Sequence, residues 1–561
     1  TYTILSEQEK IALQHRNASQ FSYLPSLLFT QGIHQPSLLQ QVYATELALK
    51  GMVLEDQKIV LNSIRKSKDN AALQLYERWY SNKVFLGKQL LLPIKQRVAY
   101  LDSLEEATNQ LEQQLSLESA AFRKQQQHLT PNDIAQKLKK GEAAIEFISF
   151  RIYNKKPLDS IMYAALVLVP GDSVVHFISL FEEKQLQRLL RSAADTTTYA
   201  AIGQLYGKKK TAKGVSDSLY QLIWKPLEKH LQGVQTIYYA PAGLLHHIAF
   251  QALSADSGSL LIDKYQLNQV LSTRSLAASA EITPKPQSAQ IWGDIAYSDF
   301  HNAGNYSLAS RKLSTRSANV SATTVSSFNL YTWDTKSVRG PGSEWRPLPS
   351  TKVEMDSLNR IFTSAGITPV MLSGSGATEE IFKAMSGKSP QVLHLATHGF
   401  FLPVKESKPK GNDLNGGDAF TMQQNPMFRS GLVLAGGNHT WKGETISAGK
   451  EDGILTAYEI AQLDLTGTDL VVLSACETAL GDVSRNEGVI GLQRALKMAG
   501  VKQMIVSLWQ VPDKATMELM TSFYKNWLSG QSTREALRRA QLQLKERYKH
   551  PYFWAAFVLV E

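Results

Sequence analysis

The chain has 561 residues, of which 43% are hydrophobic and 20% are charged, and its net charge is +10. A chain of this length is too long to fold around one hydrophobic core of ordinary size, so we expect about two to four packed units. No apolar run reaches the roughly 18 residues that a membrane-spanning helix needs, and the first residues show no signal-peptide pattern. These features predict a soluble cytoplasmic protein. The chain opens with Thr1 and not with Met, which indicates a processed start or a fragment of a longer protein.

Cys476 is the only cysteine of the chain. An intramolecular disulfide and a cysteine-rich metal site are therefore excluded, and a reducing compartment is expected. The commonest role of such a residue is that of a small buried apolar side chain. The lysine runs at 208–210 and 405–410 lie among Gly, Ser, Pro and Asn, without the interleaved aromatic residues of a stacking platform. We interpret these runs as solvated loops and expect any role of nucleic acid to be indirect.

Residues 1–135 are predicted to form an all-helical region. Apolar residues recur at helical spacing, as at Leu104, Ala107, Leu111 and Leu115, and strand-like alternation is absent. No clean repeat of about 34 residues appears in this region. One interpretation is that its helix pairs form the end of a tetratricopeptide-like array. By analogy with such arrays, we expect this region to receive a regulatory partner.

From about residue 139 the pattern changes to alternating strands and helices. In this part, strands are predicted at 143–153, 162–170, 174–180 and 236–240, and helices at 182–192 and 215–231. Such alternation predicts an α/β fold with a mostly parallel sheet between layers of helices.

The segment 298–350 interrupts this rhythm. It is rich in Ser, Thr, Asn and Gly and lacks an apolar period, which is typical of a long surface excursion. Trp333 and Trp345 indicate that part of it docks on the body of the protein. A second loop of this kind is predicted at 404–425.

The alternation then resumes up to the last residue. Strands are predicted at 369–372, 392–396, 470–475, 504–508 and 555–560, and helices at 351–365, 379–385, 488–499, 514–528 and 533–548. The strands at 392–396 and 470–475 are apolar except for His394 and Ser474, which places them in the middle of the sheet.

These two central strands end in residues that carry chemistry. The first leads to His398 and Gly399, and the second delivers Cys476 at its carboxyl end. If the strands are neighbours, imidazole and thiol face one crevice, because ligands of open α/β sheets bind beyond the carboxyl ends. The imidazole can take the proton of the thiol and later protonate a leaving amine. The backbone N–H groups of Gly399 and Cys476 would form an oxyanion hole. This combination predicts a cysteine peptidase.

The alternative that His394 and His398 bind a metal is weaker. On a strand the two residues share a face but lie about 13 Å apart, at a rise of roughly 3.3 Å per residue. A helical spacing and a third ligand would be needed. We predict neither a metal nor a cofactor, and we interpret His394 as a hydrogen-bonded core residue.

The stretch from about 139 to 561 resembles a CHAT domain, the caspase-related peptidase domain that is often fused to tetratricopeptide repeats in bacteria. The motifs that carry the resemblance follow one another in order along the chain: PAGLLH at 241–246, ATEE at 377–380, HLATHGF at 394–400, RSGLVLAG at 429–436, DGILTAYEI at 452–460, LSACET at 473–478, EGVIGL at 487–492, SLWQVPD at 507–513 and HPYFWA at 550–555.

By that resemblance, His398 and Cys476 match the catalytic dyad, and Gly399 matches the glycine beside the histidine. The family implies a caspase-like fold with a non-catalytic half at 139–285 and a catalytic half at 286–561. His246 and His247 lie in the first half with no cysteine nearby, so we expect structural roles for them. Residues 479–481 depart from the family pattern, which more often has a glycine soon after the cysteine.

The pocket for the residue before the cut is less clearly marked. In related peptidases it lies near the cysteine and the following strand, which makes Asp513, Trp509 and Asp452 candidates. A carboxylate of Asp513 in the pocket would favour Arg or Lys. The alternative that we prefer is that Asp513 caps the helix starting at 514. Asp452 is either a pocket wall or a turn former beside Gly453.

The resemblance therefore implies a gated, sequence-selective endopeptidase that cleaves a dedicated protein partner. Relatives act in bacterial defence or regulated cell death, on substrates such as a gasdermin-like pore former or a CRISPR-associated protein. The alternative is a catalytically silent scaffold that binds protein or RNA.

Overall fold

The computed structural model describes the chain except at 1–4, 33–34, 66, 68, 92–96, 119–128, 155, 172–173, 193–211, 255–258, 278–284, 300–343, 403–425, 445, 447–449, 475–480 and 485–486. Three predicted features thus lie outside the described residues: Cys476, Trp333 and the whole of the loop at 404–425. Among the helices that are described, none has both the length and the apolar character needed to cross a bilayer.

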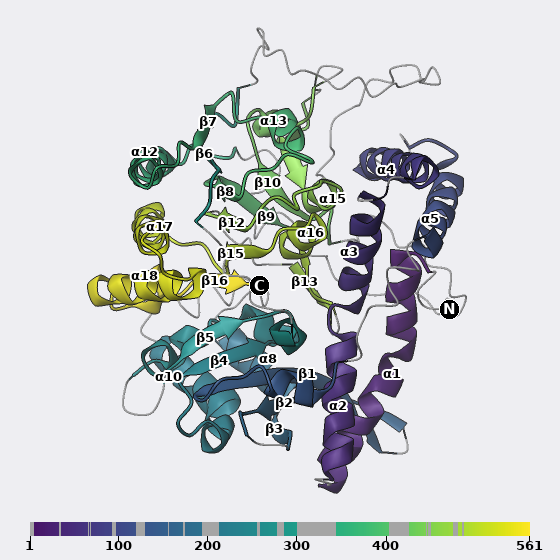
Figure 1. Ribbon diagram of the computed structural model, residues 1–561, viewed down its shortest axis with the longest axis vertical. Coiled ribbons are helices and arrows are strands. Elements are labelled where there is room, and N and C mark those ends of the chain that lie inside the picture. The colour runs from purple at the N-terminus through teal and green to yellow at the C-terminus, as the bar shows by residue number, and fades with distance from the viewer. Residues whose placement is uncertain are drawn as a thin grey trace.

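The N-terminal region is helical, as predicted, in the part that the structure describes. Its helices are α1 (Glu7–Gln31), α2 (Pro36–Leu49), α3 (Met52–Arg65), α4 (Asn70–Leu91), α5 (Leu101–Glu118) and α7 (Pro131–Ala135). The first helix begins with a capping box, in which the Ser6 hydroxyl accepts from the Glu9 N–H and the Glu9 carboxylate accepts from the Ser6 N–H. Figure 1 shows α1, α2 and α3 running along one side of the molecule.

A sheet of eleven strands forms the centre of the protein (Figure 1). Its spatial order is β3-β2-β1-β4-β5-β16-β15-β12-β8-β6-β7. The strands are β1 (Glu142–Asn154), β2 (Lys156–Leu168), β3 (His176–Glu182), β4 (Thr236–Ala240), β5 (Gln266–Gln269), β6 (Ala289–Ile295), β7 (Val370–Gly374), β8 (Val392–Leu395), β12 (Leu470–Leu473), β15 (Gln503–Ser507) and β16 (Phe557–Val560). Neighbours run parallel except at β3–β2, β2–β1 and β16–β15. The predicted mostly parallel sheet is confirmed.

The sheet joins an earlier half, β1 to β5, to a later half that contains β6, β7, β8, β12, β15 and β16. The joint is narrow, because β5 and β16 share one register pair, Gln269 opposite Val560. The flanking helices of the later half are α12 (Pro349–Ser364), α13 (Glu379–Lys383), α14 (Gly437–Trp441), α15 (Ala457–Ala461), α16 (Leu492–Met498), α17 (Asp513–Leu528) and α18 (Thr533–Arg547). Figure 1 shows α12, α17 and α18 on one side of the sheet, and α15 and α16 on the other side, next to α3.

Of the two helices predicted in the earlier half, the one at 182–192 is confirmed as α8. The helices of this half are α8 (Glu183–Ser192), α10 (Ala212–Leu219) and α11 (Leu261–Lys264), with short turns η3 (Tyr220–Trp224), η4 (Lys225–His230), η5 (Gly243–His247), η6 (Phe250–Ala252) and η8 (Thr273–Ala277). The single helix predicted over 215–231 is wrong, because the chain passes from α-helix to π-helix and then to 3₁₀-helix. Pro226 lies in the last of these turns and has no N–H with which to continue the α-helical ladder.

Two small sheets complete the later half. One has three strands in the order β11-β10-β9, with β9 (His398–Phe401), β10 (Ser430–Val433) and β11 (Ile454–Thr456), and the other is the hairpin of β13 (Gly481–Ser484) and β14 (Gly488–Gly491). His398 and Gly399, which follow the predicted strand at 392–396, begin a strand of their own, and this strand pairs with β10. The predicted helix 488–499 is shorter, because Gly488 takes a φ of 69° at the turn of the hairpin and α16 begins only at Leu492.

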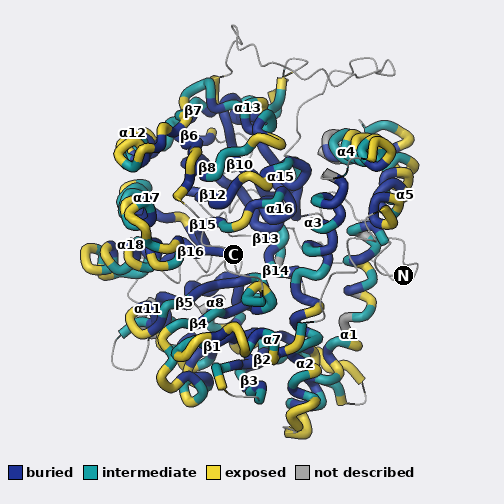
Figure 2. The backbone as a smooth tube through the Cα atoms, in the orientation of Figure 1, coloured by how far each residue is buried: buried dark blue, intermediate teal, exposed yellow. Residues whose placement is uncertain are grey.

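The helical region is an integral part of the fold. The ammonium of Lys50, at the end of α2, lies 2.9 Å from a carboxylate oxygen of Glu146 and 2.7 Å from the carbonyl oxygen of Phe147. It also donates to the carbonyl of Ala240 at the carboxyl end of β4. In Figure 2 the backbone of α3 is largely buried or intermediate where it faces α16. A buried lysine so coordinated fixes α2 to the earlier half of the sheet.

Candidate active site

The two strands that lead to the predicted dyad are neighbours. β8 and β12 pair in parallel, with Leu395 opposite Leu473, so both end at the same edge of the sheet. The condition on which the sequence argument depended is therefore met by the backbone. Cys476 follows β12 but lies outside the described residues, and Ser474 is the last residue described before it.

His398 lies three residues beyond the end of β8, as the first residue of β9, and is 6% exposed. Its Nε2 atom is 2.7 Å from the carbonyl oxygen of Arg346. A carbonyl oxygen only accepts hydrogen bonds, so Nε2 must carry the hydrogen. In the neutral ring the lone pair then resides on Nδ1, which is the atom able to take a proton from a thiol.

Two aromatic side chains from segments that precede His398 in the sequence pack against its ring. The ring centroids of Tyr297 and Trp345 each lie 4.9 Å from that of His398. Trp345 is held in turn by Asn438, whose Oδ1 accepts from the Trp345 N–H at 2.8 Å, and by an edge contact with Trp441 at 4.8 Å. The expected docking of Trp345 is confirmed, and it contributes directly to the surroundings of the histidine.

The hydrogen-bond pattern of β10 with its two neighbours, β11 and β9, determines the direction of the Gly399 N–H. On the β11 side, the Leu434 N–H donates to the carbonyl of Gly453 at 2.8 Å. Hydrogen-bonded and non-hydrogen-bonded pairs alternate along an antiparallel ladder, so Leu432 also directs its backbone groups to β11. Gly399 lies opposite Leu432 on the other side, and its N–H consequently points away from β10. The Gly399 N–H therefore makes no hydrogen bond to β10.

A small cavity of about 20 Å³ lies at the strand ends. Its lining comes from β15, β16, α12, α17 and the residues beside these helices and beyond the ends of β8 and β12: Leu348, Thr351, Glu354, Thr397, Ser474, Ser507, Val511, Asp513, Thr516 and Phe557. Thr397 precedes His398 directly, and Ser474 stands two residues before Cys476. The lining thus includes the residue directly before His398 and the last described residue before Cys476, and the volume of the cavity holds about one water molecule.

Two carboxylates face this cavity, Glu354 on α12 and Asp513 on α17. Glu354 is 2% exposed, and one of its oxygens accepts from the Ser474 hydroxyl at 2.9 Å. Burial raises the pKa of Asp513, and the charge of Glu354 raises it further. The preferred interpretation of Asp513 as a helix cap is wrong, because α17 begins at Asp513 with Pro512 at the cap position and no side-chain cap bond.

His394 is a buried core residue, in line with the sequence interpretation. Its Nε2 lies 3.0 Å from the Glu354 carboxylate, and its Nδ1 lies 3.2 Å from the Tyr524 hydroxyl. Sequence reasoning missed Glu354. The available signal was an acidic residue on the apolar face of a helix, since Met355, Leu358 and Phe362 of α12 are also buried.

The other two pocket candidates lie outside this cavity lining. Trp509 is 1% exposed and donates from Nε1 to the Tyr552 carbonyl at 3.1 Å. The Asp452 carboxylate accepts from the Ile454 N–H at 2.9 Å, which forms a turn before β11. Burial and the charge of Glu459 raise the pKa of Asp452 to about 7.

One carboxylate group among the described residues is compact enough to hold a metal ion, and it already surrounds a lysine. Glu379, Glu451 and Glu459 lie 2.6, 3.0 and 2.9 Å from the ammonium of Lys383. The ammonium occupies the position that a cation would take. The arrangement is therefore a partly buried ion network rather than a metal centre.

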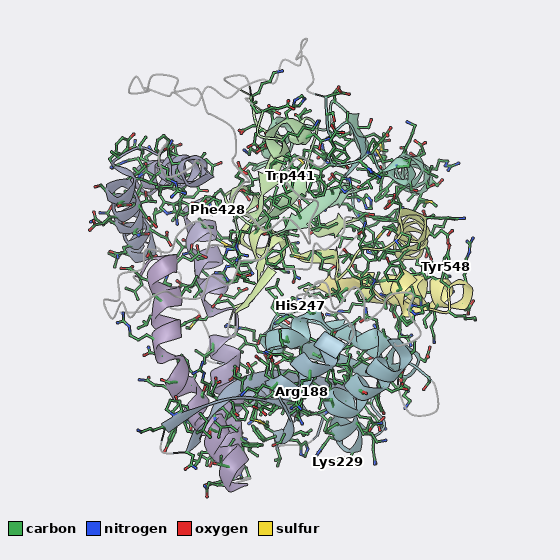
Figure 3. The ribbon with its side chains drawn as sticks, turned by 180° about the vertical axis from the view of Figure 1, so that it is seen from behind. Arg188, Lys229, His247, Phe428, Trp441 and Tyr548 are labelled. Carbon is green, nitrogen blue, oxygen red and sulfur yellow. The ribbon has the colours of Figure 1, made fainter. Side chains whose placement is uncertain are left out.

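His246 and His247 lie in η5 of the earlier half and are buried. Burial lowers the pKa of His246 to about 3 and that of His247 to about 4, so both rings are neutral. Figure 3 shows His247 near the boundary between the two halves. These surroundings agree with structural roles.

Parts of the chain are similar to a known protein family and to individual known proteins. Residues 213–561 match the model of the CHAT domain, a shorter stretch than the one from 139 that the motifs indicated. The chain is 29% identical over 228 residues to tetratricopeptide repeat protein 28 of Mus musculus and of Homo sapiens. The match covers 38% of this chain but 9% and 8% of those two proteins, so the chain spans a small part of their length.

Solved structures with similar parts include the Arg-specific cysteine proteinase gingipain R and the separase–securin complex of Saccharomyces cerevisiae. Gingipain R aligns with 66% of this chain and 69% of its own at 10% identity, with a TM-score of 0.32. The separase–securin structure at 2.6 Å aligns with 93% of this chain and 37% of its own at 10% identity, with a TM-score of 0.41. Since the family model matches more than half of the residues, the chain belongs to the CHAT domain family.

Proposed function

We propose that this protein is a cysteine endopeptidase with Cys476 as nucleophile and His398 as its acid–base partner. The observation that carries the proposal is the parallel pairing of β8 and β12, which brings the two strand ends that precede these residues to one edge of the sheet. The hydrogen bond from His398 to the Arg346 carbonyl supports it, since it leaves Nδ1 as the basic atom of the ring.

The reaction would run in two stages. His398 Nδ1 takes the thiol proton of Cys476, and the thiolate sulfur attacks the scissile carbonyl carbon to form a tetrahedral oxyanion. When this intermediate collapses, the C–N bond breaks and the imidazolium gives its proton to the leaving amine, which leaves a thioester. Water, deprotonated by the same imidazole, then attacks the thioester carbonyl, the C–S bond breaks, the imidazolium returns its proton to the thiolate, and the new carboxyl end is released.

The oxyanion would be stabilised by backbone N–H groups of Gly399 and Cys476. The direction of the Gly399 N–H, away from β10, is what supports its part in this role. A donor directed at the developing charge in a site without water is worth about 10²–10³ in rate.

For the residue before the cut, we propose a basic side chain, bound through Asp513. Two carboxylates at one small cavity favour a cationic group, and Asp513 is the less buried of them. The cavity of about 20 Å³ is too small for an arginine or lysine side chain, so binding requires the lining to move. Such a requirement fits an enzyme whose activity is gated. Asp452 and Trp509 would then support the site from outside the lining.

We further propose that the substrate is a dedicated protein partner, cleaved in bacterial defence or regulated cell death, and that a regulatory partner binds the helical N-terminal region. Both statements extend what CHAT relatives do to this chain. The cytoplasm is the expected compartment, because the reaction needs a reduced thiol.

The alternative function is a catalytically silent scaffold. It is favoured by one observation, the burial of His398, which is 6% exposed beneath Trp345. In that case the family fold would serve as a binding surface for protein or RNA.

A peptide-library assay separates the two functions. The wild type is compared with Cys476→Ala and His398→Ala, with His176→Ala as a control histidine on the edge strand β3. We expect cleavage by the wild type and by the control, loss in Cys476→Ala, and a decrease in kcat of about 10²–10⁴ in His398→Ala. Equal processing of a co-expressed partner by the wild type and Cys476→Ala would refute the enzyme and leave the scaffold.

A further inference from the structure

Glu487 is a buried acidic residue in the turn of the β13–β14 hairpin, close in sequence to Cys476. Its carboxylate is 1% exposed and lies at the N-terminus of α3. One oxygen accepts from the Val53 N–H at 3.0 Å, and the other accepts from the Leu54 N–H at 3.3 Å. The Gln14 amide of α1 donates to it as well, at 3.2 Å. Thus a side chain of the catalytic half caps the first turn of a helix that belongs to the N-terminal region.

Arg494 completes the link between the two regions. It follows the hairpin on α16 and is 2% exposed. One guanidinium nitrogen donates to Glu487 at 2.7 Å, and the other donates to Glu7 of α1 at 2.9 Å. Both N-terminal helices α1 and α3 are therefore tied to residues 487–494 by buried, charge-assisted hydrogen bonds, which are the stronger kind.

The hairpin is also linked, through Arg429, to the residue that follows the strand beginning with His398. Asp482 on β13 pairs with Arg429, whose guanidinium donates to the carbonyl of Leu402, directly after β9, at 2.7 Å. Arg429 is fully buried. The hairpin and the helix after it thus have bonds to the N-terminal helices and, through Arg429, to the end of β9, and β13 begins five residues after Cys476.

We infer that Glu487 is a positioning residue, through which the seating of α1 and α3 controls the reactivity of the Cys476 thiol. A protein partner that shifts α3 would change the contacts of Glu487, and with them the hairpin that follows the cysteine. The inference deepens the proposed peptidase function and rests on it for its consequence, since proteolysis is what the helices would regulate. The reactivity of the thiol is nevertheless measurable without any substrate.

The burial of this network has a cost that favours a specific role. A carboxylate, a guanidinium and two helix amides are removed from water, and apolar residues of similar volume would often be as stable. Glu487→Gln keeps the shape and one acceptor oxygen but removes the charge that faces Arg494 and the α3 N-terminus. The matched control is Glu55→Gln, which removes a carboxylate from the first turn of the same helix, where it pairs with Lys58 on the surface.

The test measures the rate of alkylation of Cys476 by iodoacetamide, read by mass spectrometry of the intact full-length protein. Cys476 is the only cysteine, so the signal belongs to it alone. We expect Glu487→Gln to change this rate about fivefold or more, as an energetic coupling of ordinary size would. Glu55→Gln should leave it unchanged within the error. In the peptidase assay, at equal concentrations of folded protein, kcat should fall in Glu487→Gln while KM stays the same.

Equal alkylation rates in the wild type and Glu487→Gln, with both proteins folded, would overturn the inference. If Glu487→Gln does not fold, Glu7→Gln decides, because it removes the α1 end of the link at a partly exposed position. Unchanged alkylation in that variant also overturns the inference. A changed alkylation rate in a protein that cleaves nothing would instead remove the proposed peptidase and leave the coupling between the helices and the thiol.

Discussion

The Nε2 atom of His398 lies 2.7 Å from the carbonyl oxygen of Arg346, on the segment that ends the long excursion between β6 and α12. A backbone carbonyl thus takes the place that a carboxylate often occupies behind a catalytic histidine. The contact depends on the position of the Arg346 main chain, and not on its side chain. That position is fixed by Trp345, which packs against the histidine ring.

Trp345→Ala is therefore expected to lower kcat by about tenfold or more, because a correctly placed acid–base group contributes about 10²–10⁴ in rate. KM should change little, since Trp345 does not line the cavity beside the strand ends. Arg346→Ala is the control and should keep its activity, because the alanine still supplies the carbonyl. Steady-state kinetics on one peptide measure both. A large loss in Arg346→Ala with none in Trp345→Ala would contradict the assignment.

Asp513→Asn should reduce cleavage after Arg and Lys through a higher KM, because the amide lacks the charge that binds a cationic side chain. In the wild type, burial raises the pKa of Asp513, so the carboxylate ionises at a higher pH than usual. The preference for basic over neutral residues should therefore increase as the pH rises through the acid range, and this increase should be absent in Asp513→Asn. Profiles of kcat/KM on matched peptides measure it. Asp356→Asn, on the exposed face of α12, is the control. Equal preferences in the wild type and Asp513→Asn would exclude the pocket role.

The sequence made the placing of His398 predictable. Strands that are apolar on both faces belong in the centre of a parallel sheet, and the pairing of β8 with β12 was the condition that the structure then met. The contact with Arg346 was beyond sequence reasoning, because every residue has a carbonyl group and its direction depends on the fold. Glu354 was missed for a related reason, since a glutamate on an amphipathic helix normally faces water.

The errors in the predicted elements have local causes. The helix expected at 488–499 starts late because Gly488 and Gly491 build a hairpin with β13. Aspartate is one of the residue types that commonly cap helices. At α17, however, Pro512 occupies the cap position, and the Asp513 carboxylate faces the cavity instead. Each case concerns a residue with two good local solutions, between which only the tertiary contacts decide.

Lys383→Met should destabilise the protein by about 3–5 kcal/mol at pH 8, because it leaves buried carboxylates without their ammonium. The pKa of Asp452 rises from 3.8 to about 7 on folding, and that of Glu379 also lies well above its usual value, mainly through burial. A carboxyl whose pKa rises on folding favours the folded state below its unfolded pKa, and this gain is lost as the pH rises through the folded pKa. The loss of unfolding free energy caused by Lys383→Met should thus become larger as the pH rises from about 4 to 7.

Urea unfolding of the wild type and of Lys383→Met at several pH values measures this deficit. Lys58→Met is the control, since Lys58 belongs to a partly exposed pair for which about 0–1 kcal/mol is expected at any pH. A deficit that is as large at pH 4.5 as at pH 8 would show that the carboxylates around Lys383 do not take up protons in the folded protein.

Lys50→Met tests whether the N-terminal helices and the earlier half of the sheet form one cooperative unit. The lysine ammonium neutralises Glu146, which is fully buried and also accepts from the Thr273 N–H at 2.9 Å. Removing the ammonium leaves a buried carboxylate without a counter-charge, so we expect a loss of about 3–5 kcal/mol. The double variant Lys50→Met with Glu146→Gln should recover part of this loss, because no charge then remains buried. Urea unfolding followed by tryptophan fluorescence measures both, with Lys184→Met as a surface control. If the double variant is as unstable as Lys50→Met alone, the three carbonyl contacts of Lys50, and not its charge, hold the two regions together.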